Sequence, residues 1–250
     1  MPETKTRHAA GLSGSALKWI AIVTMLIDHT GAVVIEQGAL EWAGWYWVDF
    51  ALRVIGRFAF PIFAFLLVQG FLHTRSVPRY LARLTAFALI SELPFDLATG
   101  DCWYDLGHQN VFFTLATGLV TLAALRWCER KKGSWRCWLW PAALAAGCCA
   151  ATLLRADYTW QGVLLIGIFY LLREQKTLCW LLAAPVLAWS SLSVLGTAVL
   201  ALIPLHFYNG EKGRPLPKYL FYVFYPVHLL ALFLVRFYIL GVPLLQKFPF

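Results

Sequence analysis

The sequence predicts an all-α fold: a polytopic integral membrane helical bundle of about nine transmembrane helices. Of its 250 residues, 60% are hydrophobic and 14% are charged, and the mean hydropathy is +0.65. Soluble domains are about 45–50% apolar and about 25% charged, so a soluble core could not enclose this much apolar surface. About nine spans of ~20 residues, joined by short loops, would use nearly the whole chain.

Long apolar runs place the individual spans. We expect helices over 16–35, 48–72, 80–98, 110–127, 137–154, 160–173, 177–189, 192–206 and 218–240. The polar start is followed by no small-residue cleavage site, so the first run is interpreted as a retained span and not a signal peptide. The predicted organisation is a cytoplasmic tail over 1–15, one transmembrane domain over 16–240 and a short tail over 241–250.

The sixth to eighth spans are shorter than the others, and their boundaries are less sharply marked. The apolar run from Leu178 to Phe207 is nearly continuous, and we divide it at the polar pair Ser190 and Ser191. Six of the spans contain a proline, which we expect to kink its helix while packed neighbours satisfy the freed carbonyl. These prolines are Pro61, Pro94, Pro141, Pro185, Pro204 and Pro226.

The distribution of Lys and Arg sets the orientation. The net charge is +8, from 21 Lys and Arg against 13 Asp and Glu. Sixteen of the 21 lie in the N-terminal segment and in every second connection, whereas the loops 36–47 and 96–109 carry acids and no Lys or Arg. Because cytoplasmic loops are enriched in Lys and Arg, we expect the N-terminus inside and the C-terminus outside. No basic domain is formed, so nucleic acid is not expected as a partner.

The cysteines give no indication of a metal centre or a disulfide framework. They show no CxxC spacing and no neighbouring pair of histidines, so no metal is expected. They are Cys102, Cys128, Cys137, Cys148, Cys149 and Cys179.

Polar residues from separate spans fall in one depth band in the outer half of the predicted membrane. Arg53 and Arg57 share a helix face, as do Glu92 and Asp96. Ionisable groups inside a membrane are costly, and this band predicts a hydrated cavity in which the arginines pair with Asp28, Glu92 or Asp96. The alternative is a set of buried ion pairs that only fix helix packing. The residues of the band are Asp28, His29, Arg53, Arg57, Glu92, Asp96, Asn110, Asp157, Tyr225 and His228.

His29 is the candidate general base, because an imidazole beside a carboxylate and other polar groups can take a proton from a reacting group. Either Asp28 or Glu92 could orient its ring. The alternative for His29 is an ordinary packed histidine with its hydrogen bonds satisfied.

A second group of donors lies on the predicted cytoplasmic side, where a phosphorylated cofactor could bind. The connection between spans 2 and 3 and the segment before span 9 supply it. The ordinary positive-inside bias explains the same residues equally well. They are His73, Arg75, Arg79, Arg83, Tyr208 and Asn209.

Six blocks of the sequence resemble the TraX family of bacterial inner-membrane proteins, in the family's order. They are LKWIAIVTMLIDHTGAV (17–33), LRVIGRFAFPIFAFLLVQGFLHTR (52–75), LISELPFDL (89–97), QNVFFTL (109–115), FYNGEKG (207–213) and YLFYVFYPVHLL (219–230). The family is named for the protein that N-acetylates the pilin of F-like conjugative plasmids. It is distantly similar to transmembrane acyltransferases, in which a histidine on an early span is the proposed base. His29 matches that position.

The resemblance implies acetyl transfer from cytoplasmic acetyl-CoA to an acceptor on the outer side: a pilin, an exported peptide or an envelope glycan. His29 would deprotonate the acceptor amine or hydroxyl. Asn110, Arg57 or Tyr225 would donate to the developing oxyanion. Glu92 and the Arg53–Arg57 pair match family blocks and belong to the expected site.

Two other functions fit the same residues. A proton-coupled transporter or flippase could use Asp28, His29 and Glu92 as a relay, although no internal repeat typical of transporters is found. A structural assembly subunit of an envelope machine is the third possibility, but it would have little need for His29 among carboxylates at mid-membrane.

Overall fold

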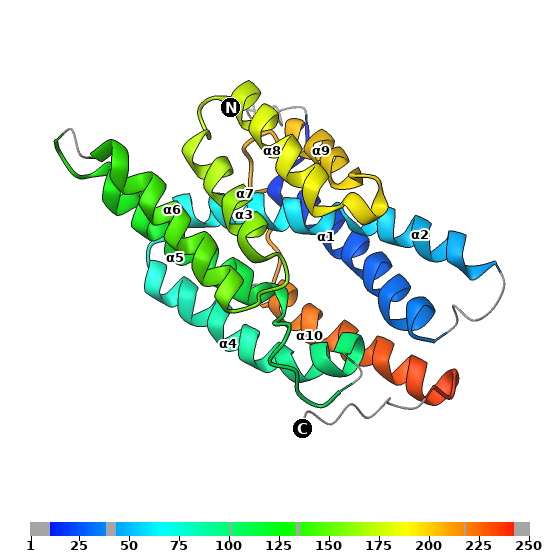
Figure 1. Cartoon of the computed structure of the whole chain (residues 1–250). Coiled ribbons are helices and arrows are strands. Elements are labelled where there is room, and N and C mark those ends of the chain that lie inside the picture. The colour runs from blue at the N-terminus through cyan, green and yellow to red at the C-terminus, as the bar shows by residue number, and fades with distance from the viewer. Residues whose placement is uncertain (1–10, 39–43, 101, 134–135, 218, 243–250) are drawn as a thin grey trace, which may run out of the picture.

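The first half of the chain folds into long helices that follow the predicted spans closely (Figure 1). The computed structural model describes residues 11–38, 44–100, 102–133, 136–217 and 219–242. At 136–137 it describes the backbone alone. Most of the predicted tails over 1–15 and 241–250 lies outside these residues. The elements are α1 (Gly14–His29), η1 (Thr30–Glu36), α2 (Trp45–Gly56), α3 (Ala59–His73), α4 (Val77–Phe95), η2 (Asp96–Gly100) and α5 (Val111–Glu129).

Two of these spans change helix type near the ends that the sequence predicts to face outward. The α-helix α1 ends at His29, and the chain continues directly as the π-helix η1. In the same way, α4 ends at Phe95 and continues as the π-helix η2. The predicted span 48–72 is broken after Gly56, so that α2 and α3 follow one another almost in line (Figure 1). π-Helical turns are rare overall, but those that occur are often found at functional sites. Here they flank the predicted band of ionisable residues.

The second half contains shorter helices. They are α6 (Arg136–Leu153), α7 (Thr159–Leu171), α8 (Lys176–Ser190), η3 (Leu192–Val194), η4 (Thr197–Ala201), α9 (Leu202–His206), α10 (Leu220–Leu234) and the π-helix η5 (Val235–Ile239). The division between α8 and the following segment falls at Ser191, as the sequence predicts.

The prediction of one continuous helix over 192–206 is wrong. Leu195 and Gly196 both have positive φ, 59° and 73°, and they break the segment into η3, η4 and α9. The Ser191 hydroxyl accepts a hydrogen bond from the Ala198 amide, which holds the turn closed. An apolar run reports burial in lipid or protein but carries no signal for such a turn, because a leucine rarely adopts positive φ.

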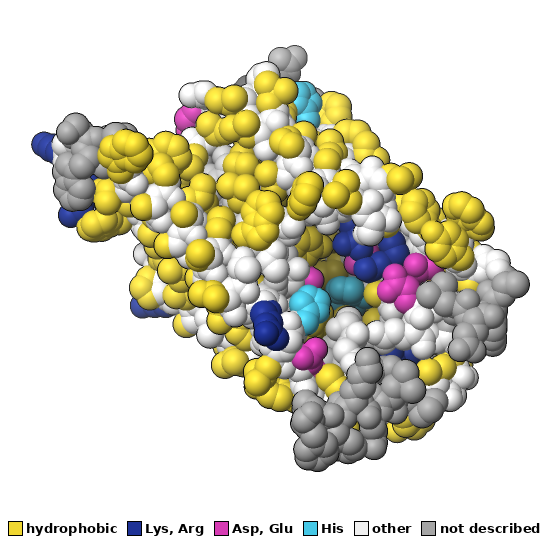
Figure 2. Space-filling model, in the orientation of Figure 1, with side chains coloured by type: hydrophobic (Ala, Val, Ile, Leu, Met, Phe, Trp, Pro, Cys, Tyr) yellow, Lys and Arg dark blue, Asp and Glu magenta, His cyan; other side chains and the backbone are white. Residues whose placement is uncertain are grey.

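Four helical segments of the described chain are long and apolar enough to cross a membrane. They are Gly14–Glu36, Trp45–His73, Val111–Glu129 and Leu220–Ile239. Large apolar side chains also face outward: Trp138, Leu153 and Leu195 expose 77%, 83% and 82% of their surface. Figure 2 shows hydrophobic side chains over most of the visible face. The chain is therefore a helical membrane protein.

Helix α3 lies in the middle of the bundle and is apolar on all sides. It packs against α1, α5 and α7, and its residues Ile62, Ala64 and Phe71 have no exposed surface. A helix that is hydrophobic all round belongs inside a bundle. Around it, α4, α5 and α6 lie side by side, and α10 packs along α4 and touches α1 (Figure 1). In this arrangement η1 contacts α2, α10, η2 and η5, so the ends of α1, α4 and α10 that the sequence predicts to face outward lie together.

Candidate active site

His29, at the end of α1, meets His228 in the middle of α10. His29 Nδ1 lies 2.6 Å from His228 Nε2, and His228 Nδ1 lies 2.8 Å from the Phe224 carbonyl oxygen. A carbonyl only accepts, so His228 Nδ1 carries a proton and, in the neutral ring, Nε2 is the acceptor. His29 then donates from Nδ1, which leaves its Nε2 with a free lone pair. His29 is thus held in the tautomer that a general base requires.

Aromatic packing holds both rings in place. The His29 and His228 rings stack with centroids 4.9 Å apart, and Phe224 stacks on the other side of His228 at 4.7 Å. Tyr225 stands edge-on to both, 5.9 Å from His29 and 5.7 Å from His228. Because these contacts restrict ring rotation, the hydrogen-bonded order of the two imidazoles is fixed by packing as well as by polar contacts.

The predicted arginine pair lies beside this histidine. Asp28 Oδ1 is 2.9 Å from Arg53 Nη1 and 3.6 Å from Arg57 Nη2, and Arg53 Nε is 3.2 Å from Glu36 Oε1. The close approach depends on Gly56, because a Cβ there would overlap the Asp28 side chain. Both arginines therefore pair with Asp28, and Arg53 also pairs with Glu36, which the sequence analysis did not single out.

Glu92 and Asp96 have other partners. Asn110 Nδ2 donates to Glu92 Oε2 at 2.7 Å and to the Ala88 carbonyl at 2.8 Å, while its Oδ1 caps α5 by accepting from the Phe112 amide. Asp96 is buried and accepts from the Asp105 amide at 3.0 Å. Glu92 thus fixes the start of α5. In the described residues, the ring partner of His29 is His228, and not Asp28 or Glu92.

Two connections that the sequence predicts on the outer side contact each other beside these groups. The Asp157 amide donates to the Gln109 carbonyl at 2.9 Å, and His108 Nε2 lies 3.3 Å from Asp157 Oδ1. The bond with the Asp157 side chain raises the pKa of His108, against the opposing effect of burial. Half of the His108 side chain is exposed, so the site reaches the surface here. Figure 2 shows the corresponding hollow, where His, basic and acidic side chains gather amid hydrophobic surface.

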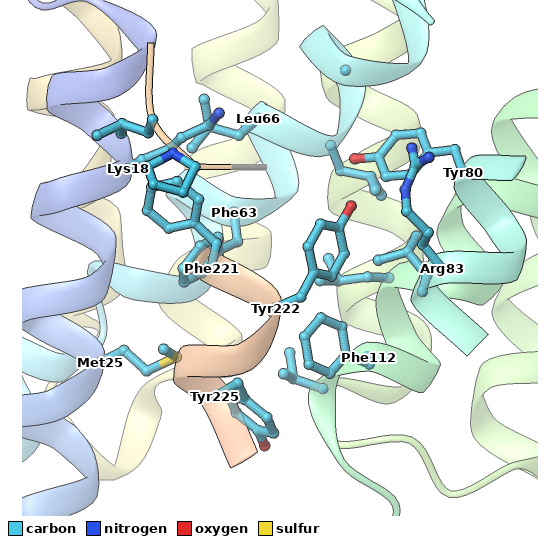
Figure 3. Close-up of a pocket in the computed structure, with 17 residues that line it drawn as sticks. Lys18, Met25, Phe63, Leu66, Tyr80, Arg83, Phe112, Phe221, Tyr222 and Tyr225 are labelled. Atoms are coloured by element: carbon cyan, nitrogen blue, oxygen red, sulfur yellow. The ribbon is translucent and has the colours of Figure 1, made fainter. Parts of the chain in front are cut away.

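A cavity of about 320 Å³ runs between α1, α3, α4, α5 and α10 (Figure 3). Figure 3 shows Lys18, Tyr80 and Arg83 at one end and Met25 and Tyr225 at the other. Its volume lies at the lower end of the range for small-molecule pockets, about 300–1,000 Å³. Since Tyr225 also contacts the His29 ring, the deep end of the cavity adjoins the histidine pair.

The predicted cytoplasmic donors do not converge on this cavity as a group. Of them, Arg83 lines it, together with the neighbouring Tyr80 and with Lys18 of α1. His73, Arg75 and Arg79 are exposed and lie outside its lining. Tyr208 and Asn209 line a second cavity, of about 350 Å³. A helical stripe offered a signal for Lys18, because it lies on the same face of α1 as Met25 and His29.

No group of three or more His, Cys, Asp or Glu side chains that could hold a metal ion occurs in the part of the chain that the structure describes.

The matches to known proteins extend over most of the chain. The family model described as "TraX protein" matches residues 13–236. A "Probable fimbrial assembly protein FimC, serogroup H1" of Dichelobacter nodosus is 31% identical over 241 residues, spanning 88% of this chain and 94% of the relative. No solved structure matches the chain. The family match includes every residue of the site described above, and the chain belongs to the TraX family.

Proposed function

We propose that this protein is a membrane-embedded acyltransferase of the bacterial inner membrane that moves an acetyl group from cytoplasmic acetyl-CoA to an amine or hydroxyl on the outer side. The observation that carries the proposal is the cavity that begins at Lys18 and Arg83 and ends at Tyr225, whose ring contacts the ring of His29. Acetyl-CoA supplies an activated thioester, and the residues supply binding and proton transfer.

The length of the cavity fits the donor. Lys18 and His29 are eleven residues apart on α1, about 16 Å along the helix axis at ~1.5 Å per residue. A pantetheine arm with its thioester extends roughly 15–20 Å by extended-chain spacings. Lys18 and Arg83 present positive charge where the phosphates would lie, and the apolar walls formed by Phe63, Phe112 and their neighbours would enclose the arm.

The histidine pair would move the proton. His29 Nε2 takes it from the acceptor amine or hydroxyl, whose lone pair forms the bond to the acyl carbon as the carbon–sulfur bond breaks. The same nitrogen then returns the proton to the departing thiolate, so that the imidazole ends neutral. His228 accepts from His29 Nδ1 throughout and stabilises the imidazolium that forms between the two steps.

Two neighbouring groups could stabilise charge on the carbonyl oxygen. The Arg57 guanidinium pairs with Asp28, the residue next to His29, and the Tyr225 ring packs against the His29 ring. Asn110, the third candidate in the sequence analysis, is committed to Glu92, Ala88 and the cap of α5. The geometry therefore favours Arg57 and Tyr225 as donors.

The acceptor would approach through the outer hollow. Acidic side chains of Glu36 and Asp157 are partly exposed there, and a relative carries the name of a fimbrial assembly protein. A pilin is accordingly the first acceptor to test, before an exported peptide or an envelope glycan.

The decisive experiment uses purified protein in detergent with labelled acetyl-CoA and a pilin-derived peptide. The wild type should acetylate the peptide, and His29→Ala should lose at least about 100-fold in rate while retaining acetyl-CoA binding. His206→Ala is the matched control, because it changes an exposed histidine that lines neither cavity, and it should keep full activity. Full activity of His29→Ala would remove His29 from the mechanism. A transporter would turn over no acetyl-CoA in detergent.

A further inference from the structure

The second cavity lies on the opposite side of α3 from the first. Phe65 and Gln69 of α3 line it, whereas Phe63, Leu66 and Gly70 of the same helix line the cavity assigned to the acyl donor. Its other walls come from α7, the start of α8 and the end of α9. A molecule in one cavity is therefore separated from a molecule in the other by the body of α3.

The lining of this second cavity is cationic. Arg173 and Lys176 border it, and none of its lining residues is an Asp or Glu. Arg173 is balanced by Glu129 and Glu174, but Lys176 has no ion pair in the described part of the chain. The unbalanced Lys176 charge leaves the cavity suited to an anion.

Neutral donors point to the same class of ligand. The indole Nε1 of Trp180 is buried and has no hydrogen-bond partner among the described residues. Gln175 is the N-cap residue of α8, and its side chain accepts no hydrogen bond from the first turn. The backbone amides of that turn, near Lys176, therefore have no side-chain cap. Helix starts with an added cation bind phosphates readily.

The rest of the wall is apolar and aromatic. Phe65, Phe169 and Leu205 form it, with the Tyr208 ring standing edge-on to Phe65 at 5.3 Å. A small inorganic anion would make no favourable contact with this apolar surface. A phosphate carried on a hydrocarbon chain would contact both the cationic and the apolar parts of the cavity. Basic pockets between helices on the cytoplasmic side suit anionic lipid headgroups.

We propose that this cavity binds an anionic phospholipid of the cytoplasmic leaflet, with its phosphate at Lys176, Arg173 and the Trp180 indole and the first part of an acyl chain against Phe65 and Phe169. The site is distinct from the donor cavity. It therefore holds its lipid whether or not acetyl-CoA is present.

Native mass spectrometry of the detergent-solubilised protein tests this proposal, with phosphatidylglycerol and phosphatidylcholine as probes. Phosphatidylglycerol should be retained preferentially, and Lys176→Gln should weaken its binding about tenfold, the effect of one lost charge-assisted bond. Trp180→Phe should weaken it less, because only one neutral donor is lost. Lys132→Gln removes an exposed lysine that lines neither cavity and should leave binding unchanged.

Three results would overturn the proposal. They are equal retention of the two lipids, an equal effect of Lys132→Gln and Lys176→Gln, or displacement of phosphatidylglycerol by micromolar CoA. The last result would assign the cavity to a soluble phosphorylated ligand. Size-exclusion elution at the wild-type volume shows that each variant is folded, so that lost binding reports on the site.

Discussion

The hydrogen bond from His228 Nδ1 to the Phe224 carbonyl decides which nitrogen of His29 is free to react. It fixes His228 as an acceptor toward His29, and the His29 proton then stays on Nδ1. His228 touches no proposed substrate atom in this arrangement. It is a positioning residue that acts through His29, and its loss should affect turnover and not donor binding.

We therefore expect His228→Ala to lower kcat by about 10–100-fold, the usual effect of removing a group that orients a reactive imidazole. The KM for acetyl-CoA should change little, because the donor cavity does not include His228. Steady-state kinetics with varied acetyl-CoA separates the two constants. An unchanged kcat, or a rise confined to KM, would contradict the positioning role.

Gly56 makes a second residue-scale prediction. A Cβ at this position would overlap the Asp28 side chain, so Gly56→Ala must displace Asp28 from Arg53 or push α2 away from α1. Overpacking of this kind costs about 1–3 kcal/mol. The thermal midpoint in detergent should fall. Gly14→Ala, where a Cβ would meet only ordinary contacts, serves as the control and should leave the midpoint unchanged or slightly raised. Equal midpoints for both variants would show that the approach is not tight.

At the scale of elements, the connections before α5 and α7 are joined through one ion pair. His108 precedes α5 and Asp157 precedes α7, so their contact links the starts of two helices that pack together. The pKa of His108 is raised above 6.5 by its bond to Asp157. A raised folded-state pKa means that the stabilisation is fully present below pH 6.5 and is lost as the pH rises through the folded-state value.

The thermal midpoint of the wild type should therefore exceed that of His108→Gln at pH 5.5, and the difference should vanish at alkaline pH. Asp157→Asn should lower the midpoint below that of the wild type at pH 5.5 in the same way, since it deletes the other partner of the ion pair. Thermal scans of the three proteins across pH test this. A difference that grows with rising pH would contradict the sign of the argument.

Helix α4 carries two arginines one turn apart that should behave differently. Arg83 lines the donor cavity, and Arg79 is exposed and lies outside it. Arg83→Gln should raise the KM for acetyl-CoA about tenfold, the equivalent of ~1.4 kcal/mol, with kcat unchanged. Arg79→Gln is its matched control. Equal effects of the two variants would mean that the basic connection acts only through its overall charge.

At the scale of the whole molecule, the alternation of charged connections predicts on which side each loop lies. Single cysteines at Lys132 and Trp103, in a background without the six native cysteines, should be labelled by a membrane-impermeant maleimide from opposite sides. Both positions are exposed. We expect Trp103→Cys to react in intact spheroplasts and Lys132→Cys only after lysis. Labelling of both before lysis would refute the proposed orientation.

Much of this architecture follows from hydrophobic runs, because they mark where a helix must be buried or face lipid. That the two arginines pair with a carboxylate of the same band also follows, since the spacing places these groups at one depth, but the choice of Asp28 over Glu92 and Asp96 does not. The histidine pair could not be predicted as a contact, because 199 positions separate its members and no local rule fixes how α10 rotates against α1. The turn at Leu195 and the break after Gly56 likewise depend on tertiary contacts that composition does not record.

The π-helical turns have a consequence for how the chain tolerates insertions and deletions. A turn of η1 closes from i to i+5 and so contains one residue more than an α-helical turn. Deleting a single residue such as Val34 would let η1 close as an α-helix, with His29 left in place. Because the residue removed is the extra one that the wider turn accommodates, Glu36 would keep its direction around the helix axis, toward Arg53. We therefore expect a single deletion within η1 to be tolerated better than a substitution of His29 or Glu36.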